Sequence, residues 1–461
     1  MSPKTHQTSK TNPFKPSALT ALTLALACAA GAWSTTAAAA RFELPDCTDP
    51  AVCKHYDGAV SRFYVPNAWM HANRSAGYDG SYGRSGMAAS YADRTVVVDS
   101  TANLGALTGA LIGRLSTGKP KTSEISGNAV YVNTGSKTEA LHLSTKVEGD
   151  VSYAYDHAAV IAGAFVDGSE KLLGNRAFVE SSLVKVGNIF GANKASFTAD
   201  TYAAPNVVSG NEVRINDAVV EKGAGIPVNP RIVGGMIGSW DVSRKSNGYF
   251  VDGPMLENAH PAVVEKNTVS ITASDVTASL LAGSWWNEVS GTSDKLPELI
   301  GDGNGVTVSE NSTLRAIAGA YLAGAYGFSH NVDDRHGRPS GLFRSFVHVS
   351  DSTLDASGGA GKGYFIIYGG TYGSNIAESS VRLTNVDFTA ATENQTVAYV
   401  RGAFSVIRAV TFDLKDYAPS REASLLLNLR TTGNTVELDG VTAEKGRLYT
   451  ITGAETNAWT H

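Results

Sequence analysis

Two stretches of this sequence carry the same pattern. Residues 266–285 read KNTVSITASDVTASLLAGSW, and residues 303–321 read GNGVTVSENSTLRAIAGAY. Each begins with Asn-x-Val-x-(Ile/Val), passes through a polar step, and ends in an apolar run that closes on Ala-Gly, a small residue and an aromatic residue. A pattern that returns after about 37 residues is typical of a stack of similar structural units.

The first half of the pattern recurs along most of the chain. Its copies lie at 95–101, 128–135, 175–182, 211–219, 267–276, 304–314, 345–354, 379–388, 411–417 and 434–441. The alternation has a period of two, which predicts a strand with one buried face. In 267–276 we expect Val269 and Ile271 to point inward, and Ser270 and Thr272 to point outward. The leading Asn suits a tight corner, because Asn tolerates positive φ.

The second half of the pattern recurs in step with the first. Its copies lie at 159–165, 188–193, 232–236, 280–285, 316–321, 365–372 and 398–404. Their glycine permits a bend or a close approach between backbones. We expect the aromatic residues that follow it to occupy equivalent positions in successive layers; these are Phe165, Trp285, Tyr321, Tyr372 and Phe404.

The repetition predicts the fold. A unit of one or two short strands and two turns cannot bury its own apolar face, whereas stacked copies can. We therefore predict an all-β chain folded as a parallel β-solenoid, and, from the habit of such folds, a right-handed β-helix. The solenoid is expected over 94–461, with an irregular N-terminal cap over 41–93. Its C-terminal end carries no cap, so we expect a C-terminal part to be missing.

Residues 1–40 have the features of a secretory signal peptide. They carry three lysines and no acidic residue, an apolar stretch over 18–30, and a small-residue run that ends before Arg41. A lipoprotein acylated at Cys28 is the alternative. Removal of this segment leaves 35 basic against 43 acidic residues, a formal charge of −8. An acidic exported chain has no electrostatic reason to bind nucleic acid or an anionic membrane surface.

Two cysteines remain after residue 40. Cys47 and Cys53 lie in CTDPAVC, and in an exported chain this spacing predicts one small disulfide loop. A metal site is the weaker interpretation, because His55 is the only other soft ligand nearby.

The exported character, the Gly-, Ala-, Asn-, Ser- and Thr-rich composition and the tandem repeats resemble the passenger domain of Gram-negative autotransporters, a class of type V secreted surface proteins. The resemblance covers about 95–441. It implies a β-helix that is displayed on the outer membrane and cell surface or released as an extracellular protein. The family's translocator barrel needs at least about eight strands, for which the sequence after 441 has no room. We expect membrane association only through a translocator that is not present in this chain.

Catalytic motifs are not recognisable. The sequence has no HExxH and no GxSxG, and the P-loop-like GRLSTGKP at 113–120 carries Pro120 where a Mg²⁺-binding Ser or Thr belongs. We predict that the chain is not an enzyme and needs no cofactor. The segment 330–338 is the densest polar run, and it holds His330, Asp333, Asp334 and His336. These side chains could bind a divalent cation, but a solvated loop tip is the favoured interpretation, because Arg335 and Arg338 lie beside the carboxylates.

Acidic residues recur near the middle of the repeats. They are Asp217, Asp275, Asp351, Asp387 and Asp413. A ladder of carboxylates along one corner could bind Ca²⁺ or a cationic partner, whereas turn residues need no function.

The stretches after the second half-pattern vary in length, at 237–265, 286–302 and 322–344. Insertions at one register leave a solenoid on one side, which is often the binding side. They supply the candidate interaction residues Trp240, Trp286, Tyr326 and Phe328, with the His/Asp run above. The sequence therefore favours an adhesin whose loops bind a host glycan or matrix protein. A polysaccharide lyase or hydrolase on the same scaffold and a structural stalk are the alternatives.

Overall fold

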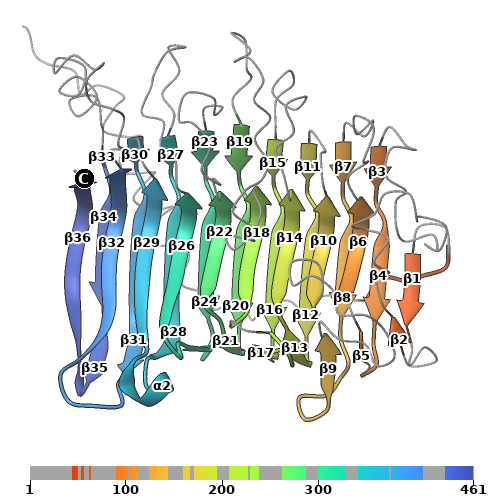
Figure 1. Cartoon of the computed structure of the whole chain (residues 1–461), viewed down its shortest axis with the longest axis horizontal. Coiled ribbons are helices and arrows are strands. Elements are labelled where there is room, and N and C mark those ends of the chain that lie inside the picture. The colour runs from red at the N-terminus through yellow and green to blue at the C-terminus, as the bar shows by residue number, and fades with distance from the viewer. Residues whose placement is uncertain are drawn as a thin grey trace, which may run out of the picture. The chain divides into compact units, whose positions relative to one another are not determined.

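The computed structural model describes residues 44–49, 53–56, 62–63, 90–101, 103–104, 106–112, 124–143, 159–166, 171–194, 207–226, 229–237, 262–286, 299–327, 341–372, 375–408 and 431–459. Residues from Arg41 onward form one compact unit. Within the described residues this unit consists almost entirely of parallel strands in three long sheets (Figure 1). The predicted all-β parallel solenoid is confirmed.

Each sheet collects one strand, or two, from every coil of the chain. Sheet B contains β3 (Ser90–Ala92), β7 (Glu124–Ser126), β11 (Lys171–Leu173), β15 (Val207–Ser209), β19 (Ala262–Glu265), β23 (Leu299–Asp302), β27 (Gly341–Phe343), β30 (Asn375–Ala377) and β33 (Thr431–Thr432). Sheet C contains β6 (Ala106–Ile112), β10 (Val160–Val166), β14 (Asn188–Lys194), β18 (Arg231–Ile237), β22 (Leu280–Trp286), β26 (Gly319–Gly327), β29 (Tyr364–Tyr372), β32 (Gln395–Arg408) and β36 (Gly446–Trp459).

Sheet A takes two short strands from most coils. The first of each pair is β1 (Cys53–Tyr56), β4 (Thr95–Val98), β8 (Ala129–Val132), β12 (Arg176–Glu180), β16 (Glu212–Asn216), β20 (Thr268–Thr272), β24 (Gly305–Ser309) and β34 (Thr435–Asp439). The second is β2 (Arg62–Phe63), β5 (Asn103–Leu104), β9 (Ala140–Leu143), β13 (Leu183–Val186), β17 (Val219–Lys222), β21 (Asp275–Thr277), β25 (Thr313–Arg315) and β35 (Thr442–Glu444). In two coils a single longer strand takes both places, β28 (Phe346–Asp355) and β31 (Ser380–Thr389), and a short helical turn, α2 (Gly358–Gly361), follows β28.

A coil runs from sheet B through a tight corner into sheet A, through a second corner, and then into sheet C. The two stretches that share the opening pattern lie on adjacent coils, with Val269 beside Val306 and Ile271 beside Val308. Val269 and Ile271 are buried as predicted, and Ser270 is partly exposed. Thr272 was expected to face solvent but is buried, because it ends its strand between Asn216 and Ser309 of the neighbouring coils.

The corner between sheets B and A is built around a buried ladder of asparagines. Asn175 Nδ2 donates to Asn211 Oδ1 at 3.0 Å, and Asn211 Nδ2 donates to Asn267 Oδ1 at 2.9 Å. Asn128 and Asn304 extend the ladder at either end. Our expectation that these asparagines adopt positive φ was wrong. That conformation belongs to the residue before each corner position, and these residues are Asp93, Gly127, Gly174, Gly210, Lys266, Gly303, Arg344, Glu378 and Gly433.

A row of glycines runs through sheet C where it approaches sheet A. A Cβ on Gly163 would lie 2.3 Å from the backbone N of Arg176, and one on Gly283 would lie 2.2 Å from the backbone N of Gly305. The predicted close approach of backbones is therefore confirmed. In the next coil the row continues through Gly324, where a Cβ would lie 2.3 Å from the backbone N of Phe346. It does not pass through Gly319, which belongs to the first of two successive Ala-Gly-Ala-Tyr copies.

The aromatic row that follows the glycines was only partly predicted. Strand register places Phe165, Trp285 and Phe404 in one row across sheet C, as expected. Tyr321 was assigned to this row wrongly, because Trp285 pairs with Tyr326 and Tyr321 pairs with Leu280. Tyr372 was also assigned wrongly, because Thr371 is the residue beside Tyr326 and Phe404.

Two further observations concern the ends and the environment of the unit. Cys47 and Cys53 form the predicted disulfide, with their Cα atoms 5.2 Å apart. Among the residues that the structure describes, no helix is long and apolar enough to cross a membrane.

Candidate interaction surface

The outer side of sheet C carries three rows of side chains from β18 to β32. The fully buried row of Ile232, Leu281, Leu322, Ile367 and Val400 faces the core. Residues one position before and one after this row therefore face outward, because side chains alternate along a strand. The first outer row is Arg231, Leu280, Tyr321, Ile366 and Tyr399; the second is Val233, Ala282, Ala323, Tyr368 and Arg401; the third is Met236, Trp285, Tyr326, Thr371 and Phe404. Seven of these residues are nevertheless buried, with at most 6% of their surface exposed: Leu280, Val233, Ala282, Ala323, Tyr368, Met236 and Thr371. The partly exposed members are Arg231, Tyr321, Ile366, Tyr399, Arg401, Trp285, Tyr326 and Phe404.

The first and third rows lean toward each other. Tyr321 and Tyr326 are five residues apart on β26, yet their ring centroids lie 5.3 Å apart at 67°. The strand dips toward sheet A at Gly324, which has no Cβ to keep the two backbones apart. Trp285 of the preceding coil joins this pair, with its ring centroid 6.2 Å from that of Tyr326. The glycine row thus brings aromatic side chains from distant positions of one strand into contact.

A second aromatic group surrounds Arg401 on β32. The guanidinium carbon lies 4.9 Å from the ring centroid of Phe404, 5.6 Å from that of Tyr399 and 5.7 Å from that of Tyr368. Tyr368 and Phe404 stack nearly in parallel, with centroids 5.2 Å apart. Arg401 also pairs with Glu455 on β36. A guanidinium held over several ring faces is a favourable cation–π arrangement.

Burial raises the pKa of two tyrosines on this face above the ordinary value of 10. It raises the pKa of Tyr368 to about 12, against an opposing effect of Arg401. Burial also raises the pKa of Tyr321. Both hydroxyls therefore stay protonated at neutral pH and remain able to donate hydrogen bonds.

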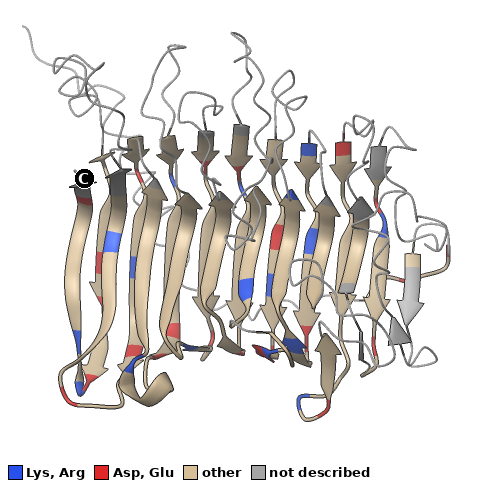
Figure 2. Ribbon diagram, viewed as in Figure 1, with Lys and Arg blue, Asp and Glu red and all other residues tan. Residues whose placement is uncertain are grey.

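The aromatic contacts continue to the last coil. The ring centroids of Tyr364 and Tyr399 lie 6.0 Å apart, and those of Tyr399 and Tyr449 lie 5.3 Å apart. Tyr449 is 63% exposed. Three adjacent strands of the face, β22, β26 and β29, contain no charged residue, so they carry no blue or red segment in Figure 2. We call the three outer rows from β18 to β32, with Tyr364, Tyr449 and Glu455, the sheet C face.

The sequence-predicted interaction residues fall into two groups. Tyr326 lies within the sheet C face, between Trp285 and Thr371 of the adjacent coils. Trp286 ends β22, and only its backbone, which pairs with Gly327, is described. The remaining predicted residues, which are Trp240, Phe328, His330, Asp333, Asp334 and His336, lie outside the described residues.

The long insertions share one place in the coil. Residues 238–261 join β18 to β19, 287–298 join β22 to β23, and 328–340 join β26 to β27. Each connection therefore leaves the carboxyl end of a sheet C strand and returns to the start of a sheet B strand. All three predicted insertions need correction at both ends, because they overlap strands. Residue 237 belongs to β18 and 262–265 form β19, 286 belongs to β22 and 299–302 form β23, and 322–327 belong to β26 and 341–343 form β27.

The acidic residues of the repeats do not form one row. Asp217 and Asp351 occupy the corner between the two strands of sheet A with φ of 49° and 45°, whereas Asp275 begins β21 and Asp387 lies within β31. Asp413 lies outside the described residues. No group of three or more His, Cys, Asp or Glu side chains in the described ranges could hold a metal ion. Asp217 and Asp351 lie at turns, where Asp is favoured, and this position explains the residue type without a metal-binding role.

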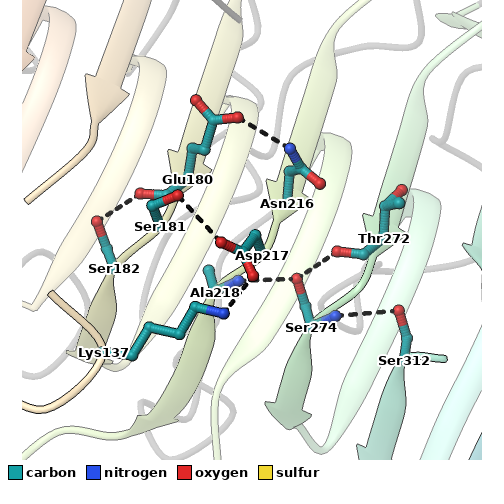
Figure 3. A network of polar contacts seen from close by, with 10 residues as sticks. All are labelled: Lys137, Glu180, Ser181, Ser182, Asn216, Asp217, Ala218, Thr272, Ser274 and Ser312. Carbon is teal, nitrogen blue, oxygen red and sulfur yellow. Dashed lines mark hydrogen bonds and ion pairs between the residues drawn. The ribbon is translucent and has the colours of Figure 1, made fainter. Parts of the chain in front are cut away.

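The polar side chains of this corner form hydrogen bonds and ion pairs with side chains of neighbouring coils (Figure 3). Asp217 pairs with Lys137 and accepts a hydrogen bond from Ser181 Oγ at 3.2 Å. Glu180 Oε1 accepts from Asn216 Nδ2 at 2.9 Å. The carboxylates of this corner already bind side chains of neighbouring coils, so they stabilise the stack. We therefore place the candidate site on the sheet C face instead.

Arginines and tyrosines of the sheet C face were missed from the sequence alone. Tyr399 and Arg401 flank the buried Val400 on β32, and Tyr368, which is itself only 6% exposed, follows the buried Ile367 on β29. The alternation that placed Val269 and Ile271 in the core would also have placed these residues outside.

The chain matches no protein-family model, no curated protein and no solved structure.

Proposed function

We propose that this chain is an exported β-solenoid that acts as an adhesin, with the sheet C face as its contact surface. The observation that carries the proposal is the presence on that face of two groups of aromatic side chains, one around Tyr326 and one around Arg401. Tyr, Trp and Arg supply most of the residues that dominate protein interfaces. Because the sheet and the ring–ring contacts already fix these side chains, binding loses little of their rotamer entropy.

A protein ligand, such as a matrix protein, suits this surface better than a glycan. Sugars stack on ring faces that are free, whereas here the edge of one ring covers the face of the next, as for Trp285 and Tyr326. Arg401 covers the faces of Tyr399 and Phe404 in the same way. A protein partner can instead pack apolar side chains against this relief and use the tyrosine hydroxyls as hydrogen-bond donors.

Display at the cell surface is a further part of the proposal. It rests on the signal-like residues 1–40 and on the resemblance to autotransporter passengers. The connections between sheets C and B begin at the carboxyl ends of the sheet C strands.

The test is binding of the purified protein to immobilised matrix proteins and to a glycan array, beside a Tyr321→Ser/Tyr399→Ser variant. Loss of two hot-spot rings is expected to weaken binding by about 2 kcal/mol, or about thirtyfold in Kd. Tyr131→Ser is the matched control, because Tyr131 on sheet A is a half-buried ring whose centroid lies 5.0 Å from that of Phe178, at an interplanar angle of 53°. Equal weakening by the control, or binding that the double variant leaves unchanged, would remove the sheet C face from the function.

A second variant separates the face from the insertions. Replacement of 328–340 by a short Gly-Ser linker leaves β26 and β27 intact. We expect this variant to retain most of the binding that the tyrosine variant loses. Binding lost only in the linker variant would support the loop-based adhesin that the sequence favoured.

A further inference from the structure

From β26 to β32, the partly exposed rings of the first and third outer rows recur on every second strand. In the first row Tyr321 lies on β26 and Tyr399 on β32, with the smaller Ile366 of β29 between them. In the third row Tyr326 and Phe404 occupy the same two strands, on either side of a buried threonine of β29. Neighbouring strands are about 4.8 Å apart, so equivalent rings of β26 and β32 are separated by about 9.6 Å along the stack.

This spacing distinguishes among the regular conformations of a peptide that lies across the strands. A polyproline II helix has three residues per turn and rises about 3.1 Å per residue, so equivalent side chains recur every ~9.3 Å. An extended strand repeats its side chains on one face every ~6.6–6.8 Å. Two turns of an α-helix span about 10.8 Å. The polyproline II repeat matches two strand spacings most closely, with a difference of about 0.3 Å.

The charge and the hydrogen-bonding groups of the sheet C face also fit a proline-rich chain. Strands β22, β26 and β29 contain no charged residue, and Arg401 on β32 is already paired with Glu455. Burial raises the pKa of Tyr321, so its hydroxyl is protonated at neutral pH and can donate a hydrogen bond. A polyproline II segment has no internal hydrogen bonds, and its backbone carbonyls are therefore free to accept one. Proline itself is uncharged and has no backbone N–H that needs an acceptor.

We propose that the sheet C face binds a proline-rich segment of a protein partner in the polyproline II conformation. The inference rests on the proposed function of this face and names the structural class of its ligand. The segment lies across β22, β26, β29 and β32, which are neighbours in the sheet (Figure 1). One residue packs against Tyr321 and Tyr326, and the residue three positions further along packs against Tyr399 and Phe404. Because such a segment is ordered before it binds, association costs it little conformational entropy.

The experiment measures binding of a fluorescently labelled polyproline peptide to the purified protein by fluorescence anisotropy. We expect the wild-type protein to bind this peptide and not a Gly-Ser peptide of equal length. Tyr321→Ser/Tyr399→Ser should weaken binding by about tenfold or more, because it removes one ring from each of the two groups. Tyr131→Ser on sheet A is the matched control and should bind as the wild-type protein does. Circular dichroism spectra of both variants should be unchanged.

The same variants separate this inference from the proposed function. If the double variant loses binding to a matrix protein while the wild-type protein fails to bind polyproline, the sheet C face remains a contact surface and the polyproline II inference is overturned. Polyproline binding that the double variant leaves unchanged would also overturn the inference. Absence of binding to both ligands would contradict the inference and the proposed function together.

A second pair of peptides tests the three-residue repeat. In a Pro-Pro-Glu repeat all glutamates lie on one side of the polyproline II helix and can face solvent. In a peptide of the same composition with glutamates on all three sides, at least one is held against the rings and loses hydration. We expect the repeat to bind about tenfold more tightly than the rearranged peptide. Equal affinity of the two peptides would contradict contact at every third residue.

Discussion

At the scale of single residues, the asparagine ladder shows how a buried polar group holds neighbouring coils together. Asn211 Oδ1 accepts from both the backbone N and the Nδ2 of Asn175, and Asn211 Nδ2 donates to the carbonyl O of Leu172 and to Asn267. Every hydrogen-bonding atom of the amide is therefore in use. A buried amide of this kind is stabilising only while all of its partners remain.

Removal of one rung should be costly. We expect Asn211→Ala to lower the free energy of unfolding by about 2–4 kcal/mol, because it removes buried hydrogen bonds to the backbone N and Nδ2 of Asn175, to Asn267 Oδ1 and to the carbonyl O of Leu172. Asn133→Ala is the control. Its amide is only partly buried and makes a longer bond of 3.4 Å to Glu180, so its loss should cost less than about 1 kcal/mol. Similar costs in urea denaturation of the two variants would contradict this account of the ladder.

The ladder has a gap that can be filled. Ser345 and Ser379 occupy the two corner positions between Asn304 and Asn434, and their hydroxyls are buried without hydrogen-bond partners. Their sheet C neighbours Ala325 and Gly370 are small, like the neighbours of the existing asparagines. We expect Ser345→Asn/Ser379→Asn to raise the free energy of unfolding by about 1–2 kcal/mol. A loss of stability would show that the gap cannot accommodate the longer side chain.

His348 adds a dependence on pH. Burial lowers its pKa below the ordinary value of 6.5, with a further lowering by Arg382. The unfolded chain therefore binds the proton more readily, and stability falls as the pH drops through the unfolded pKa. We expect His348→Gln to lose less stability than the wild-type protein between about pH 7 and pH 5.5. An equal fall in the free energy of unfolding with pH for the two proteins over that range would contradict this role of His348.

At the scale of the strand, a missing Cβ decides where sheet C meets sheet A. The sequence predicted a glycine with this role but could not select between Gly319 and Gly324, because both sit in Ala-Gly-Ala-Tyr. The difference lies in long-range packing, since only at Gly324 does another backbone occupy the Cβ position. The same ambiguity misplaced Tyr321, and with it the aromatic contacts on which the sheet C face depends.

This distinction can be measured. Gly324→Ala would place a Cβ 2.3 Å from the backbone N of Phe346, and we expect it to lower the free energy of unfolding by about 3 kcal/mol or more. Gly319→Ala would meet the hydroxyl end of Tyr364 at 2.7 Å, which can move aside, so a cost below about 1 kcal/mol is expected. The reverse order in thermal or urea unfolding would place the glycine row at Gly319.

At the scale of the whole molecule, the repeat predicted the architecture because each of its features serves stacking. Alternating Val and Ile supply the core of sheet A, the asparagines supply the corner, and the glycines set the distance between sheets. The candidate site was less predictable. Outward-facing rings form a surface only when strands from coils about 40 residues apart lie side by side. The sequence pattern indicated the insertions as the candidate site instead.

The sheet C face as a contact surface is the central claim, and amide hydrogen exchange with and without a bound matrix protein tests it most directly. Peptides from β26, β29 and β32 should gain protection on binding, whereas peptides from β8, β12 and β16 on the opposite sheet should exchange as before. Protection confined to sheet A, or to the connections alone, would contradict the account.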